Sequence, residues 1–127
     1  ANEQEVWQVI SGFNDAFANN DPETYFGFID EDIIVITPSN PYRIEGIHDD
    51  REEFEFVLQK GYSRVGYFQE LQPLITIYGE VAVVTYYSRG AYGQDGNQRT
   101  IYLKETDVLV KRDGTWKIVH IHVSATP

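Results

Sequence analysis

The spacing of apolar residues changes along the chain, from a helical period near the N terminus to a strand period from residue 67 onward. In the first segment, apolar side chains recur three and four residues apart. This spacing predicts a helix with one buried face, formed by Val6, Val9, Ile10, Phe13, Ala16 and Phe17. Asp21 and Pro22 then supply an N-cap and a first-turn proline, and they predict a short second helix that runs to about Phe28.

Strands dominate the rest of the chain. Residues 33–37 are continuous and β-branched, which predicts a buried strand. Asp50 and Glu53 form a capping box for a third helix that ends at Gly61. Four long strands joined by glycine-containing turns are then expected at residues 67–78, 81–92, 98–112 and 115–124. The order ααβαββββ predicts an α+β fold, with helices on one side of a curved antiparallel sheet, in one domain over residues 1–127.

The charge balance limits the partners of this domain. The chain has 127 residues with 20 acidic and 10 basic side chains, and its formal net charge is −10. Because such a surface repels phosphate groups, we expect neither nucleic acid nor a membrane as a partner. Cysteine is absent, which excludes disulfides and thiolate nucleophiles. No apolar run is long enough to span a membrane, and residues 1–5 are acidic where a secretory signal is basic, so we expect a cytoplasmic protein.

The expected sheet is apolar on both faces. Residues 81–84 read Val-Ala-Val-Val, and the last strand alternates two sets of large side chains. Three helices cover only one face of such a sheet, so we expect the second face to pack on another copy of the chain, in a homodimer or a larger ring. The predicted interface residues on the last strand are Trp116, Ile118, His120 and His122.

The C-terminal segment holds the most specific sequence features, which are Glu105-Thr106, Arg112-Asp113-Gly114, Trp116, Val119-His120-Ile121-His122 and Ser124. Earlier segments add Asn19-Asn20-Asp21, Glu23, Tyr25 and Glu45-Gly46. Together these residues resemble the association (hub) domain of calcium/calmodulin-dependent protein kinase II, within the SnoaL-like, nuclear transport factor 2-like superfamily. The resemblance extends over essentially the whole chain. It implies a cone-shaped, cystatin-like sheet wrapped around a helix, a pocket between them, and an outer face used for assembly.

This resemblance also predicts a function. It implies a free-standing oligomerisation domain with a small-molecule pocket and no identified catalytic set. The pocket of the resembling hub binds small carboxylates through arginines, and the matching positions here are Tyr87, Asp107 and Val123. None of them is basic, so a neutral or cationic ligand is expected. The exception would be a positive charge restored by Arg89 and Arg99, which are also odd-numbered and so are expected on the same side of their strands. The predicted pocket lining is Phe13, Phe17, Tyr25, Tyr87, Arg89, Arg99, Glu105, Asp107 and Val123.

Asp107 leaves two interpretations open. It is either a base of raised pKa in a SnoaL-like isomerase, cyclase or dehydratase, or one half of a structural ion pair with Arg89 or Arg99. The sequence favours the ion pair. In the enzyme alternative, Tyr87, Arg89 or Glu105 would support the base.

Two other kinds of chemistry lack the residues they need. The positions that match the base and the phenol of a ketosteroid-isomerase site are Thr37 and Phe13, and neither side chain can act in those roles. His120 and His122 stand two apart on a strand, but no third metal ligand is evident, so we expect no metal and no cofactor.

Overall fold

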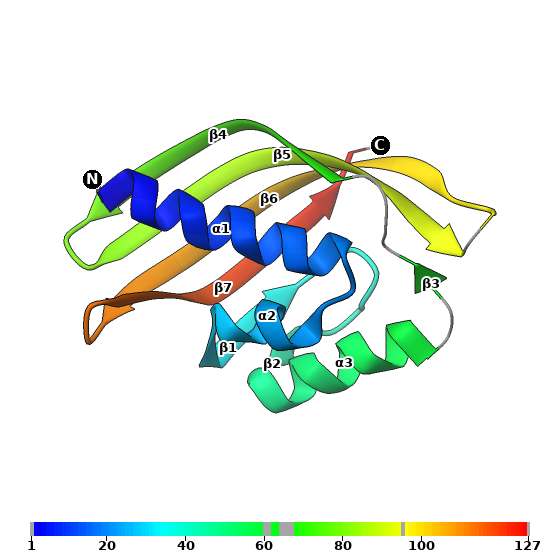
Figure 1. Ribbon diagram of the computed structural model, residues 1–127, viewed down its shortest axis with the longest axis horizontal. Helices are drawn as coiled ribbons and strands as arrows, with labels where there is room; N and C mark the ends of the chain where they lie inside the picture. The colour runs from blue at the N-terminus through cyan, green and yellow to red at the C-terminus, as the bar shows by residue number, and fades with distance from the viewer. Residues whose placement is uncertain (1, 60–61, 64–67, 95, 127) are drawn as a thin grey trace.

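Three helices pack against a curved sheet in the computed structural model, which describes residues 2–59, 62–63, 68–94 and 96–126 (Figure 1). The helices are α1 (Asn2–Ala18), α2 (Pro22–Gly27) and α3 (Ile47–Gln59). The strands are β1 (Ile29–Ile36), β2 (Ile44–Glu45), β3 (Tyr62–Ser63), β4 (Phe68–Tyr78), β5 (Val81–Gln94), β6 (Arg99–Arg112) and β7 (Thr115–Ala125). Helix α1 crosses the concave face of the long strands, while α2 and α3 lie beside β1 and β2 (Figure 1). The predicted α+β fold is confirmed. No helix among these residues is long and apolar enough to cross a membrane.

The sheet has the strand order β2-β1-β7-β6-β5-β3, and β4 pairs with β5 beside β3. Strands β4 to β7 form the antiparallel meander that the turn signals predict. Strand β1 instead joins β7 in parallel, and it begins at Ile29, four residues before the expected start at Ile33. The segment from Asp30 to Asp32 is acidic, which concealed the first part of this strand from the sequence pattern.

Two helix starts show how local chemistry sets the boundaries. Asp21 caps α2 as predicted, because its side chain accepts hydrogen bonds from the Thr24 backbone N–H at 3.3 Å and from the Thr24 hydroxyl at 2.7 Å. The predicted cap of α3 at Asp50 is wrong, because the Asp50 backbone N–H already donates to the Gly46 carbonyl at 3.1 Å. Gly46 has a φ of 92°, which favours glycine, and α3 begins directly after it. The predicted end of this helix at Gly61 and the predicted first residue of the meander, Tyr67, lie outside the described residues.

A bulge in β7 changes which side chains face the core. Ile118 pairs with Leu109 but His120 pairs with Val108, so Val119 is an extra residue on β7. Before the bulge, Trp116 and Ile118 face α1 and are buried; after it, the inward positions pass to residues 121 and 123. The prediction that Trp116, Ile118, His120 and His122 share one interface side is therefore wrong for Trp116 and Ile118.

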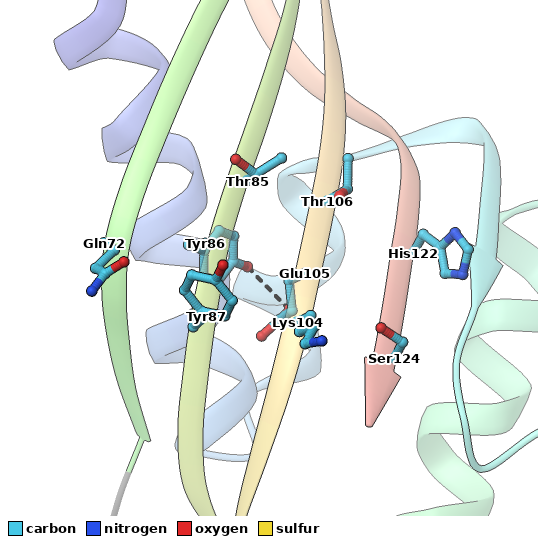
Figure 2. A pocket seen from close by; sticks show the side chains of 9 residues that line it. All are labelled: Gln72, Thr85, Tyr86, Tyr87, Lys104, Glu105, Thr106, His122 and Ser124. Atoms are coloured by element: carbon cyan, nitrogen blue, oxygen red, sulfur yellow. Dashed lines mark hydrogen bonds between the residues drawn. The ribbon is translucent and has the colours of Figure 1, made fainter. Parts of the chain in front are cut away.

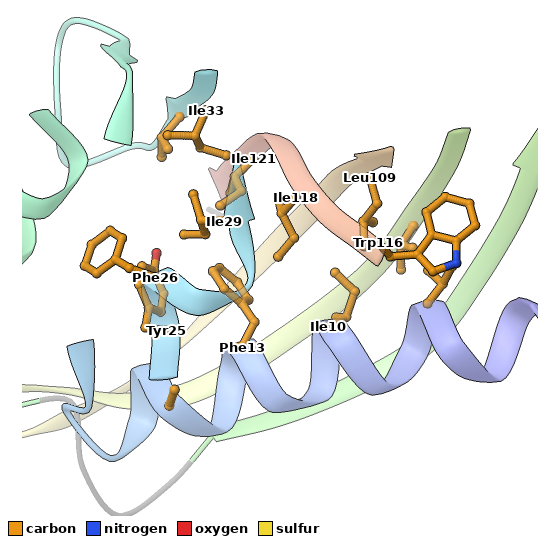
Figure 3. Close-up of a cluster of buried hydrophobic side chains, with 14 of the residues drawn as sticks. Ile10, Phe13, Tyr25, Phe26, Ile29, Ile33, Leu109, Trp116, Ile118 and Ile121 are labelled. Carbon is orange, nitrogen blue, oxygen red and sulfur yellow. The ribbon is translucent and has the colours of Figure 1, made fainter. Parts of the chain in front are cut away.

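The hydrophobic core lies between α1 and the concave face of the sheet. Ile10 and Phe13 project from α1 toward side chains of β6 and β7, which include Leu109, Ile118 and Ile121 (Figure 3). At the α2 end, aromatic rings extend the core through Tyr25, Phe26 and Phe54. The core holds α1 across the strands, and this placement brings one polar side chain of α1, Asn14, onto the middle of the sheet.

Candidate functional site

A phenol bridges two carboxyl groups on the concave face of the sheet. Tyr86 on β5 pairs in register with Glu105 on β6, and Asp107 lies two residues further along the same face of β6. The Tyr86 Oη atom is 3.1 Å from Glu105 Oε1 and 3.0 Å from Asp107 Oδ2. All three side chains are buried, and Asp107 is 0% exposed.

Helix α1 contributes an amide to the same network. The Asn14 Nδ2 atom donates to Tyr86 Oη at 3.1 Å and to Glu70 Oε2 on β4, also at 3.1 Å. Asn14 is buried, whereas Glu70 is only partly buried. We call these five residues the acid cluster: Asn14, Glu70, Tyr86, Glu105 and Asp107.

The hydrogen count of the acid cluster fixes its protonation. A phenol carries one proton, so Tyr86 donates to only one of its two carboxyl neighbours. The other carboxyl makes a favourable contact only if it is itself protonated and donates to the phenol oxygen. The cluster therefore holds at least one neutral carboxyl group in its hydrogen-bonded form. In addition, Asp107 Oδ1 is buried with no hydrogen-bond partner among the described residues, whereas the Ser88 side chain lies beside the Glu105 carboxyl group as a hydrogen-bond donor.

Electrostatics act in the same direction. Burial raises the pKa of Asp107 well above its ordinary value, and the neighbouring Glu105 charge raises it further. Burial also raises the pKa of Glu105 and, nearer the surface, that of Glu70. Among the described residues the salt bridges join other carboxylates, as in Arg112 with Asp30 at 3.4 Å, and none compensates the acid cluster.

The register of β5 with β6 separates the predicted pocket residues. Even-numbered residues of β5 share a face with odd-numbered residues of β6, so Asp107 faces α1 while Tyr87 and Arg89 lie on the opposite, outer face. The prediction that Tyr87 and Arg89 line a pocket with Asp107 is therefore wrong. Arg89 Nε instead donates to Gln69 Oε1 at 2.8 Å.

The other predicted pocket residues lie on the concave side of the sheet. Val123 on β7 pairs with Glu105 and is partly buried. Arg99 is exposed at the start of β6, where it pairs in register with Tyr92. Asp107 makes no salt bridge with an arginine in the described part of the chain, so the expected ion pair with Arg89 or Arg99 is wrong.

The predicted aromatic lining is packed into the core. The Phe13 and Tyr25 rings stack with their centroids 4.6 Å apart, and both side chains are buried. Phe17 is partly buried, with its ring centroid 6.2 Å from that of Tyr25 and 6.2 Å from that of Phe68. These rings hold α1 and α2 on the sheet.

The convex, outer face of the sheet carries large exposed apolar side chains. We call five of them the outer patch; with their exposed fractions they are Leu74 64%, Tyr78 67%, Val81 37%, Tyr87 46% and Tyr102 50%. The ladder places all five on this face of three adjacent strands, β4 to β6. Surface patches of this kind on folded domains are typical of protein interaction sites.

A depression of about 300 Å³ adjoins the outer patch (Figure 2). Its lining includes Tyr87, the hydroxyls of Thr85, Thr106 and Ser124, and the side chains of Lys104 and His122. His122 thus lies on the outer face, as the interface prediction required, and so does His120, which pairs with Val108. The pocket expected from the sequence was on the other side of the sheet, between helix and strands.

One group of side chains on α3 has the composition of a metal site. His48, Asp49 and Glu52 bring ligand atoms within 4.8 Å of one another, but all three are exposed and His48 Nε2 already contacts Glu52 Oε1 at 2.9 Å. Exposed groups of this kind are common without any metal, and we assign it no role.

The fold defines an α+β domain of the nuclear transport factor 2-like class. A nuclear transport factor 2-like protein of Pseudomonas putida superposes with a TM-score of 0.86 at 18% identity, over 98% of this chain and 86% of that one. A family model, the calcium/calmodulin dependent protein kinase II association domain, matches residues 2–127, and the chain belongs to this family.

Two relatives illustrate the family. The association domain of the Caenorhabditis elegans kinase is 27% identical with a TM-score of 0.79, and the match covers 98% of this chain and 95% of that one. The rabbit calcium/calmodulin-dependent protein kinase type II subunit delta is 31% identical over 130 residues. That match covers 100% of this chain but only 24% of the rabbit protein, so the chain spans about a quarter of the length of this relative.

Proposed function

We propose that this domain self-associates, and that the outer face of the sheet packs on the same face of a second copy. The outer patch is the observation that carries the proposal. Membership of an association-domain family supports it, and so does the arrangement of the fold, because α1 already covers the concave face. A second copy is the occupant we favour, since an isologous contact needs only one self-complementary surface.

Packing two outer patches together would remove large aromatic and aliphatic side chains from water. Fully burying one such side chain contributes about 1.5–3 kcal/mol, and these five are on average about half exposed in the single chain. Several such contributions on each copy are of the size needed to offset the entropy lost on association. Charged substitutions within the patch should therefore dissociate the assembly.

The test compares substitutions inside and outside the outer patch. The unaltered chain should have a light-scattering mass of at least twice 14.6 kDa, and Leu74→Glu with Tyr87→Glu should reduce it to that of one chain. The matched control is Tyr42→Glu, because Tyr42 is 80% exposed in the loop before β2 and lies away from the patch. Equal masses for the double variant and the control would refute the outer face as the interface.

We also propose that the acid cluster is a small-molecule site, separate from the assembly surface. It lies on the concave face, whereas the outer patch lies on the convex one. Its support is the Asp107 Oδ1 atom, which is buried beneath α1 beside a second carboxyl group and has no hydrogen-bond partner among the described residues. Buried polar atoms are normally hydrogen-bonded, so an unpartnered carboxyl oxygen indicates a position for a bound group.

A second candidate function uses Asp107 as a general base in an isomerase, cyclase or dehydratase. Two observations favour it: Asp107 has no arginine partner among the described residues, and burial raises its pKa toward the range of a useful base. Of the supporting residues expected from the sequence, Glu105 lies beside Asp107, whereas Tyr87 and Arg89 are on the other face.

This candidate predicts proton abstraction next to a carbonyl group. Small ketones in deuterated water should exchange their α-hydrogens faster with the unaltered chain than with Asp107→Asn, as measured by proton NMR. Equal exchange rates would exclude Asp107 as a base for this class of substrate.

A further inference from the structure

The acid cluster contains more acceptors than donors. The Asn14 amide already donates to Glu70 and to Tyr86, and the single Tyr86 proton serves one carboxyl group. Asp107 Oδ1 lacks a hydrogen-bond partner among the described residues, whereas hydrogen bonding from the Ser88 side chain opposes the rise in pKa that burial causes at Glu105. Because no salt bridge from a lysine, arginine or histidine in the described part of the chain reaches the cluster, what these residues lack is a positively charged group with several N–H donors.

The spacing of the carboxyl groups restricts the kind of cation. Among the described residues, three ligand-bearing side chains come within 4.8 Å of one another only at His48, Asp49 and Glu52. The oxygens of Glu70, Glu105 and Asp107 therefore do not all lie within 4.8 Å of one another, as three carboxylate ligands of one metal ion would. A guanidinium or amidinium group spreads its N–H donors over two or three nitrogens in a plane, and so reaches separated oxygens.

We propose that the acid cluster binds a small planar organic cation, a guanidinium or amidinium compound, with Asp107 and Glu105 as its main acceptors. This inference rests on the small-molecule site proposed above and names its ligand class. The cation supplies the missing donors and takes the place of the proton that the carboxyl pair otherwise holds.

Small and aromatic side chains adjoin the acid cluster. The next inner-face positions on β5 after Tyr86 are Ser88 and Gly90, both buried and small. The ring centroids of Trp7 and Tyr86 lie 6.2 Å apart, with the two rings in an edge-on arrangement. This places aromatic surface beside the acid cluster. Glu70 lies on β4, which pairs only with β5 among the described strands, and it is the member of the acid cluster that is only partly buried.

The test titrates the whole chain with methylguanidinium by calorimetry near pH 7.5. N-methylurea serves as the neutral analogue of the same shape, and acetate as the anionic control. We expect saturable binding of methylguanidinium alone, with proton release that shows as a dependence of the heat on the buffer. Affinity should fall by about tenfold or more near pH 5.5, where protons compete for the carboxyl groups.

Variants and controls make the outcomes decisive. Asp107→Asn should weaken methylguanidinium binding by about tenfold or more, whereas Asp32→Asn, at an exposed position, should leave it unchanged. If circular dichroism shows that Asp107→Asn does not fold, Glu105→Gln replaces it. Binding of N-methylurea or acetate at least as tight as that of methylguanidinium would overturn the ligand class and leave the site standing. Binding of none of the three, or equal binding by the Asp107 and Asp32 variants, would overturn the site itself.

Discussion

Removal of one buried carboxyl group should change how the stability of this domain depends on pH. Asp107→Asn is the most informative substitution, because asparagine keeps the shape of the side chain and its amide can donate to Tyr86 as a protonated carboxyl would. Burial raises the folded-state pKa of Asp107 well above the ordinary value of 3.8. Between these two pKa values the folded chain keeps a proton that the unfolded chain has lost.

The sign and size of the effect follow from proton counting. Where the folded state binds one proton more than the unfolded state, the free energy of unfolding falls as the pH rises, by about 1.4 kcal/mol per pH unit. The stabilisation of the folded state by this proton is complete at acid pH. It declines as the pH rises above the ordinary carboxyl pKa, and it is fully lost above the folded-state pKa. Glu105 adds to the same slope, because burial raises its pKa too and the two carboxyl groups titrate together.

Urea unfolding at a series of pH values, followed by the fluorescence of Trp7 and Trp116, measures this slope. One protein concentration is used throughout, because association changes apparent stability. The unaltered chain should lose stability from pH 5 to pH 8, and Asp107→Asn should remove about 1.4 kcal/mol per unit of that loss within the affected window. Asp32→Asn is the exposed control. Equal slopes for the two variants, or unaltered-chain stability that rises with pH, would refute a buried proton at Asp107.

Two further predictions follow from the core and the outer face. Tyr86→Phe should lower the free energy of unfolding by about 1–3 kcal/mol, because it leaves buried hydrogen-bonding partners unpaired. Tyr102→Phe on the outer face is the control and should change this free energy by less than about 0.5 kcal/mol. Urea unfolding of both variants measures the difference, and equal losses would contradict the prediction. Trp116→Ala should cost about 3–5 kcal/mol in the same assay, and a loss of assembly without that cost would contradict its place in the core.

The sequence was sufficient for the elements that local patterns define. The helical face from Val6 to Phe17 and the capping of α2 by Asp21 and Pro22 depend only on neighbouring residues, and both are found. The four long strands also follow from alternation and turn residues. Exposed apolar side chains on the second face of the sheet were expected from the excess of apolar strand positions, which is a count that needs no register.

The assignment of residues to faces needed information that local patterns do not contain. Alternation shows which residues of one strand share a face, but only the register of β5 with β6 shows that Tyr87 and Asp107 face opposite ways. The bulge at Val119 reverses which side chains of β7 face inward, and no residue type in the sequence indicates a bulge at this position. The acid cluster had one usable signal that was missed: Asn14, a polar side chain four residues after Ile10 on the buried stripe of α1.

Hydroxyl-radical footprinting tests most directly whether the outer face is the assembly surface. The chain is labelled at a concentration where it is assembled and again after dilution to the single chain, and oxidation is read at each tyrosine by mass spectrometry. Tyr78, Tyr87 and Tyr102 should be protected several-fold in the assembled sample, while Tyr42 is oxidised equally in both. Oxidation of the three outer-patch tyrosines at the same rate in both samples would contradict self-association through this face.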